Sequence, residues 1–81
     1  MPTLNEFMKT LVNVDEDIDY IIMDVREELV GYLSFDKYFE CVVKSCIDVD
    51  VDINRAKVIE VCFMSDVKVV TIMIDAVIIY V

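Results

Sequence analysis

The hydrophobic positions change their spacing once along this chain, near residue 46. Before that point apolar residues recur at intervals of three and four, which is typical of amphipathic helices, and after it they alternate with polar residues, which is typical of half-buried strands. The spacing predicts helices over residues 3–13, 15–33 and 35–46 and strands over residues 47–53, 58–64 and 67–80. We therefore expect one α+β domain over residues 1–81, with three N-terminal helices packed on one face of a C-terminal antiparallel meander of three or four strands.

Residues suited to helix starts support the three expected helices. Thr3 and Glu6 have the spacing of a capping box, in which each side chain accepts a backbone N–H at the start of the helix. Asn13 or Asp15 can cap the second helix, and Ser34 can cap the third.

The first expected strand, IDVDVDI at residues 47–53, alternates apolar residues with carboxylates. Strand geometry sends Asp48, Asp50 and Asp52 to one face, about 6.6 Å apart, and their apolar neighbours to the core. A metal ion would need the three carboxylates to converge, whereas side chains on a straight strand run parallel, so we expect no metal site. Two interpretations stay open: a solvated edge-strand face, or a row of charges spaced like the phosphates of a nucleic acid.

The outer face of the expected sheet combines this acidic row with an apolar strip from the last strand, which is typical of a binding surface. Together with residues on one stripe of the second helix, the acids form the expected partner-binding set: Asp48, Asp50, Asp52, Glu60, Asp17, Asp24, Glu28 and Tyr20. The apolar strip forms the expected homodimer interface: Val67, Val69, Met73, Val77 and Ile79. The last strand also outruns its neighbour, so residues 74–81 either bend into a fourth strand or pair with another copy.

Composition adds one expectation about the surface and one about location. Of the 81 residues 58% are apolar, more than so small a domain can bury, which predicts apolar surface left over after folding. The most apolar tract, residues 58–81, carries four charged side chains, so we expect no membrane-spanning helix. The N-terminus lacks the features of a signal peptide, and the three cysteines have no paired spacing, which together favour a cytoplasmic protein with free thiols.

Charge and missing residue types narrow the function classes. Sixteen acidic against seven basic residues give a formal net charge of −9, which repels nucleic acid and attracts basic protein surfaces. The chain has no histidine, the commonest general base and transition-metal ligand, and its single glycine excludes a glycine-rich phosphate loop. We therefore expect no enzyme and no cofactor.

In size, charge and lack of a catalytic set, the chain resembles the small acidic inhibitors encoded by phages and other mobile elements. The resemblance is one of composition and rests on no motif. It implies a non-enzymatic inhibitor that occupies the basic nucleic-acid-binding surface of a host protein by mimicking nucleic acid. Two alternatives are a homodimeric interaction or scaffold module, whose acids only confer solubility, and an immunity or antitoxin protein.

Overall fold

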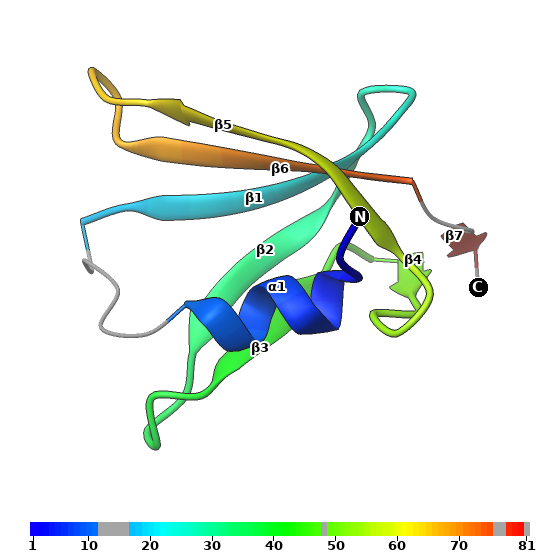
Figure 1. Cartoon of the computed structure of the whole chain (residues 1–81), viewed down its shortest axis with the longest axis horizontal. Helices are drawn as coiled ribbons and strands as arrows, with labels where there is room; N and C mark the ends of the chain where they lie inside the picture. Colours follow the sequence, from blue (N-terminus) through cyan, green and yellow to red (C-terminus); the bar gives the residue numbers. More distant parts are fainter. Residues whose placement is uncertain (12–16, 48, 76–77, 81) are drawn as a thin grey trace.

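The computed structural model describes residues 1–11, 17–47, 49–75 and 78–80. Figure 1 shows one short helix and a mostly β architecture in these ranges. The elements are α1 (Leu4–Thr10), β1 (Asp19–Asp24), β2 (Leu29–Phe35), β3 (Cys41–Ser45), β4 (Val49–Val51), β5 (Lys57–Met64), β6 (Val69–Asp75) and β7 (Ile78–Tyr80).

Five of the strands form one mixed sheet in the order β3-β2-β1-β6-β5. The central strands β1 and β6 are parallel, and every other neighbouring pair in this sheet is antiparallel. Strands β4 and β7 form a separate antiparallel ladder. In Figure 1 the sheet is strongly twisted, and α1 lies in the angle between the β5–β6–β1 part and the β2–β3 part.

The core lies between α1 and one side of the sheet. Leu4 is fully buried and Met8 nearly so, and the sheet contributes Ile22 from β1 together with Ile72 and Ile74 from β6. These sheet residues share one face because Ile22 pairs with Ile72 and the side chains of a strand alternate. The short helix therefore covers only one face of the sheet.

The expected α+β fold, with three helices packed on a meander, is wrong. Residues 15–33 contain β1 and most of β2 instead of a helix, and residues 35–46 contain β3. The helical spacing arose because these strands carry apolar side chains on both faces, which removes the alternation that marks a half-buried strand. In β1, for example, Ile22 is buried while Ile21 lies on the opposite face.

The capping box at the first helix is confirmed. The Glu6 N–H donates to Thr3 Oγ1 at 3.2 Å, and the Thr3 N–H donates to Glu6 Oε1 at 3.1 Å. The Thr3 N–H, followed by the Thr3 hydroxyl, lowers the pKa of Glu6 below its usual value. The helix ends at Thr10, a little before the expected residue 13.

The C-terminal half differs from the expected meander in its register. The turn between β5 and β6 has four residues, Ser65–Lys68, so Met64 pairs with Val69 instead of Val67. A shift of two residues keeps each side chain on its expected face, because side chains repeat every second residue. The expected strand at 67–80 is two strands, and β7 pairs with β4, so Asp50 lies beside Ile79.

Two hairpin turns, which join β1 to β2 and β2 to β3, share one construction. Asp24 Oδ1 accepts the N–H groups of Arg26 at 2.9 Å and Glu28 at 3.0 Å. Asp36 Oδ1 likewise accepts the N–H groups two and four residues later, at 2.8 and 3.0 Å. The fourth residue of each turn has a positive φ, 64° at Glu27 and 62° at Phe39, a conformation that usually selects glycine or asparagine.

Candidate functional site

The side of the sheet away from α1 is an apolar surface that no described helix covers. Strand pairing places three rows of side chains on it, and we call this surface the open face. The rows are Val42, Ser34, Asp19, Val69 and Met64; Lys44, Tyr32, Ile21, Thr71 and Cys62; and Leu29, Met23, Met73 and Glu60.

Exposure confirms that this surface is uncovered. Leu29, Tyr32 and Met64 are 41%, 46% and 48% exposed, while Ile21 and Met73 near the middle are half-buried by their neighbours alone. Three rows about 6.7 Å apart across five strands about 4.8 Å apart span roughly 20 by 24 Å, on the order of 480 Å². Five of the fourteen side chains in these rows are polar or charged, so the apolar part is about 300 Å², at the lower end of the range for the largest apolar patch on a monomer, and such patches often have a function.

Charged groups on the open face lie at its margins. Asp19 and Glu60 occupy different rows, and Lys44 lies on the outer strand β3. None of the three takes part in an ion pair within the described residues. The centre of the face is therefore apolar, and its two carboxylates are free to meet basic groups of a partner.

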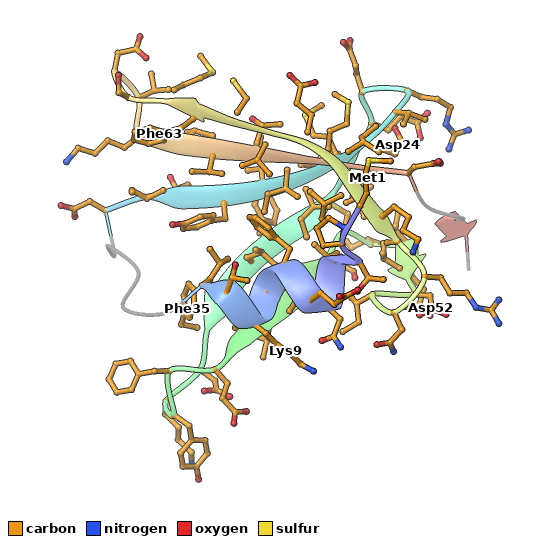
Figure 2. All side chains as sticks on the ribbon, in the orientation of Figure 1. Met1, Lys9, Asp24, Phe35, Asp52 and Phe63 are labelled. Carbon is orange, nitrogen blue, oxygen red and sulfur yellow. The ribbon has the colours of Figure 1, made fainter. Side chains whose placement is uncertain are left out.

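The acidic row expected at 47–53 does not lie on the five-stranded sheet. Asp48 falls outside the described residues, and Asp50 is exposed on the short strand β4. Asp52 begins a turn: its carboxylate accepts the Asn54 N–H at 3.0 Å and lies 3.6 Å from the guanidinium of Arg55. Figure 2 shows Asp52 beside β4, far along the molecule from Phe63 on β5.

The residues expected on one helical stripe are dispersed. Asp17 is exposed and lies 3.8 Å from the Lys68 ammonium, and Glu28 is exposed with its carboxylate 3.7 Å from the guanidinium of Arg26. Tyr20 is half-buried on the core side of β1. Because no helix exists in this segment, the stripe does not form.

Asp24 is the buried member of that set, with 2% of its surface exposed. Burial on its own raises the pKa of Asp24, but the N–H groups of Glu28 and Arg26 and the Arg26 guanidinium bring the net pKa below its ordinary value. An Arg26 Nη2 lies 3.0 Å from Asp24 Oδ2. Asp24 is thus an ionised residue that closes a turn, and a partner cannot reach it.

The expected dimer strip is also divided. Val69 and Met73 lie on the open face, as does Glu60 from the acidic set. Val67 is exposed in the β5–β6 turn, Val77 lies outside the described residues, and Ile79 belongs to β7. The sequence thus identified part of the β5–β6 half of the open face. It missed the β1 and β2 half, notably Ile21, Met23, Leu29 and Tyr32, because those residues were assigned to a helix.

Other features of the described residues offer less to a ligand. A shallow groove of about 360 Å³ lies between α1 and the segment Phe39–Cys41, with Lys9 and Glu40 at its lining. Burial raises the pKa of the Cys41 thiol. No cluster of three or more metal-binding side chains occurs in the described ranges. Within the same ranges, no helix is both long and apolar enough to cross a membrane.

Comparison with known proteins gives no match to a family model, a curated protein or a solved structure. Neither the comparisons nor the mostly β structure gives evidence for an inhibitor, a phage origin or nucleic-acid mimicry, and Asp50 and Asp52, the described members of the row on which the mimicry hypothesis depended, do not lie on the five-stranded sheet. That hypothesis is therefore withdrawn.

Proposed function

We propose that this chain is a non-enzymatic protein-binding module whose open face docks on another protein. The observation that supports it is the contiguous apolar face, with Ile21, Met23, Thr71 and Met73 at its centre. Uncovered apolar surface of this extent costs solubility in water, and contact with a partner removes it from water.

The charge of the chain indicates the chemistry of the partner. A net charge of −9 attracts basic protein surfaces, and the carboxylates of Asp19 and Glu60, which form no ion pair with the described residues, lie beside the apolar centre. The matching surface is an apolar patch with lysine or arginine at its rim. Contacts between the acidic groups and a basic rim raise the rate of association and make binding depend on salt, while the apolar centre provides most of the affinity. A cytoplasmic location, where Cys62 stays a free thiol, is part of the proposal.

The test compares two variants that add the same charge in different places. Met73→Arg puts a guanidinium in the open face, and Val67→Arg puts one in the exposed β5–β6 turn. We expect a partner captured by the wild-type chain to be lost with Met73→Arg and kept with Val67→Arg. Both positions are away from the core, so both variants are expected to keep the wild-type circular dichroism spectrum.

Oxidative footprinting of the purified complex locates the contact. Met23, Met64 and Met73 lie on the open face, whereas Met1, which precedes Pro2 at the beginning of the outer edge of β5, is 79% exposed and serves as the internal control. The proposal predicts that the partner protects the three open-face methionines and leaves Met1 as reactive as in the free chain. A complex that forms equally well with Met73→Arg, with no protection of these methionines, would contradict it.

A further inference from the structure

The outer edge of β5 offers backbone groups that no described residue pairs with. β5 is hydrogen-bonded to β6 on one side, and the N-terminal segment covers only the beginning of the other side. There the Val58 N–H donates to the Pro2 carbonyl at 2.9 Å, and Thr3 bridges Lys57. Past the bulge between Val58 and Glu60, the outer edge of residues 60–64 has no strand beside it in the described part of the chain.

The direction of these backbone groups follows from Val58. Val58 faces the core opposite Ile74, and its N–H points away from β6 because it reaches Pro2. In a strand of L-residues, side-chain face and N–H direction alternate together, so residues on one face point their N–H groups the same way. Val61 and Phe63 share that face, since they pair with the core residues of β6. Their N–H and C=O groups therefore point outward.

Apart from Glu60, the side chains along this edge are apolar on both faces. Val61 and Phe63 are 45% and 55% exposed on the core side, and Cys62 and Met64 are exposed on the open face. Proteins protect long apolar edges with charged side chains, proline or a covering segment, and in the described structure residues 60–64 have only the charge of Glu60 at their start. The other edge strand, β3, carries Lys44.

We infer that β5 pairs antiparallel with β5 of a second copy of this chain, about a two-fold axis at Cys62, to join the two sheets into one of ten strands. The inference depends on the β5 edge alone and holds whether or not the open face binds a partner. A strand edge with free backbone groups pairs with any suitable strand, so the choice of a second copy has to come from the side chains.

The register follows from three requirements. Opposite residues must lie on the same face of the joined sheet. Because residues on one face of β5 are two apart, an odd-numbered residue must pair with an odd-numbered one and an even-numbered residue with an even-numbered one. Pairing must stay within residues 60–64, because Pro2 already covers the outer edge of Val58, the bulge follows it, and the turn begins at Ser65, which excludes an axis at Met64. Like charges must not face each other, which excludes an axis at Glu60 and also one at Phe63, where Glu60 would face Asp66.

An axis at Cys62 satisfies all three requirements. It places Val61 opposite Phe63 of the second copy, and both residues point their N–H and C=O groups at each other. Glu60 then faces Met64, and the two Cys62 residues face each other in a non-hydrogen-bonded pair. In such a pair the Cα atoms lie about 4.5 Å apart, within the range of about 4.4 to 6.8 Å that a disulfide spans.

The first experiment measures association by sedimentation velocity over the micromolar range. The expected result is a concentration-dependent monomer–dimer equilibrium under reducing conditions. Phe63→Pro removes an outward N–H without breaking the β5–β6 ladder, and we expect it to weaken the dimer about tenfold or more, because one hydrogen bond is lost per copy. If Phe63→Pro fails to fold by circular dichroism, Val61→Lys, which puts a charge at the same edge, takes its place.

The second experiment tests the register. In a chain with Cys41→Ser and Cys46→Ser, copper phenanthroline as the oxidant is expected to join the two Cys62 thiols into a disulfide dimer. Chains that keep only Cys41 or only Cys46 are the matched controls and are expected to stay monomeric under the same oxidant. The inference is overturned by a monomer at every concentration, by a dimer that tolerates both edge variants, or by a Cys62 that does not cross-link.

Met73→Arg separates this inference from the proposed function. It changes the open face and leaves the outer edge of β5 intact, so the dimer is expected to persist. A dimer that Met73→Arg abolishes and Phe63→Pro preserves uses the open face, and that result contradicts the inference while leaving the open face as a binding surface.

Discussion

The two matched turns give a direct measure of what burial contributes at Asp24. Asp24 and Asp36 each accept two backbone N–H groups at 2.8 to 3.0 Å with the same spacing. They differ in surroundings: Asp24 is 2% exposed and paired with Arg26, whereas Asp36 is only half-buried and has no ion pair within the described residues. Truncating each to alanine removes the same two backbone hydrogen bonds, and at Asp24 it also removes the hydrogen bond from Arg26 Nε at 3.1 Å.

Asp24→Ala is expected to lower the free energy of unfolding by about 3 kcal/mol, since each of its two hydrogen bonds to a buried carboxylate contributes about 1.5 kcal/mol. Asp36→Ala is expected to cost about 1 kcal/mol, because water can replace a half-buried carboxylate at the N–H groups. For a domain of this size the difference corresponds to roughly 8–16 °C in Tm. Urea unfolding followed by circular dichroism measures both variants, with the slope m expected to stay unchanged.

The pH dependence provides a second check on Asp24. Its folded-state pKa lies below the ordinary value of 3.8, so the stability that its charge contributes is fully present above that pH and is lost as the pH falls through the folded pKa. Asp24→Asn keeps the shape and one acceptor oxygen but cannot ionise. The stability gap between the wild type and Asp24→Asn is therefore expected to be constant from pH 7 to about 5 and to shrink below pH 3.8. Equal losses for Asp24→Ala and Asp36→Ala, or a gap that widens in acid, would refute the reasoning.

Three further substitutions test the local structure. Gly31→Ala is expected to lower the free energy of unfolding by about 2 kcal/mol or more, because its Cβ would lie 2.5 Å from the Lys44 carbonyl oxygen. Hydrogen exchange should show the loss of protection in β2 and β3, with Ser34→Ala as the control. Phe39→Gly is expected to raise stability by about 0.5 kcal/mol in urea unfolding, because it relieves a φ of 62°, and a decrease would contradict the assigned turn. Thr3→Ala is expected to cost about 1 kcal/mol by removing the helix cap, and Thr3→Ser should restore most of it.

The strands of the N-terminal half were hidden by the same property that makes the open face. When both faces of a sheet are apolar, strands read as continuous apolar runs, and such runs also match the three-and-four spacing of a helix. Tyr20, Ile21, Ile22 and Met23 are consecutive in β1, with Ile22 in the core and Ile21 on the open face. The composition predicted apolar surface left over after folding, and this is confirmed. The spacing of the hydrophobic residues could not show that this surface is the second face of a sheet.

The turns were hidden by their residue types. Each begins with an aspartate and has a glutamate four residues later, in the segments DVREE and DKYFE, which resembles a capped and charge-patterned helix. The positive-φ positions hold Glu27 and Phe39 instead of the glycine or asparagine that usually mark such turns. The one sequence signal for these turns was the repeated spacing of aspartate and glutamate, four residues apart, between apolar runs. That spacing fits a helix as well as a hairpin, and only tertiary packing decides between them.

The faces of the C-terminal strands could be predicted from the sequence, because buried and partly exposed residues alternate along β6. Val70, Ile72 and Ile74 are buried, and the residues between them lie on the open face. The alternation of side chains alone therefore put Val69, Met73 and Glu60 on the correct face, although the predicted turn was two residues too short. The position of β5 at the sheet edge was not predictable, because it depends on β1 inserting beside β6 from a distant part of the chain.

The proposed dimer edge on β5 fixes how the two open faces of the dimer are oriented. A two-fold axis at Cys62 runs perpendicular to the sheet, because paired residues on β5 and its second copy share a face. Such an axis keeps both open faces on the same side of the ten-stranded sheet, with Cys62 and Met64 of each copy at the junction. A partner with two basic, apolar-centred sites would engage both faces at once, and its avidity would then depend on the β5 edge even though no β5 backbone group touches it. In that case dimer formation would adjust how tightly a bivalent partner is held without changing the affinity of a single open face.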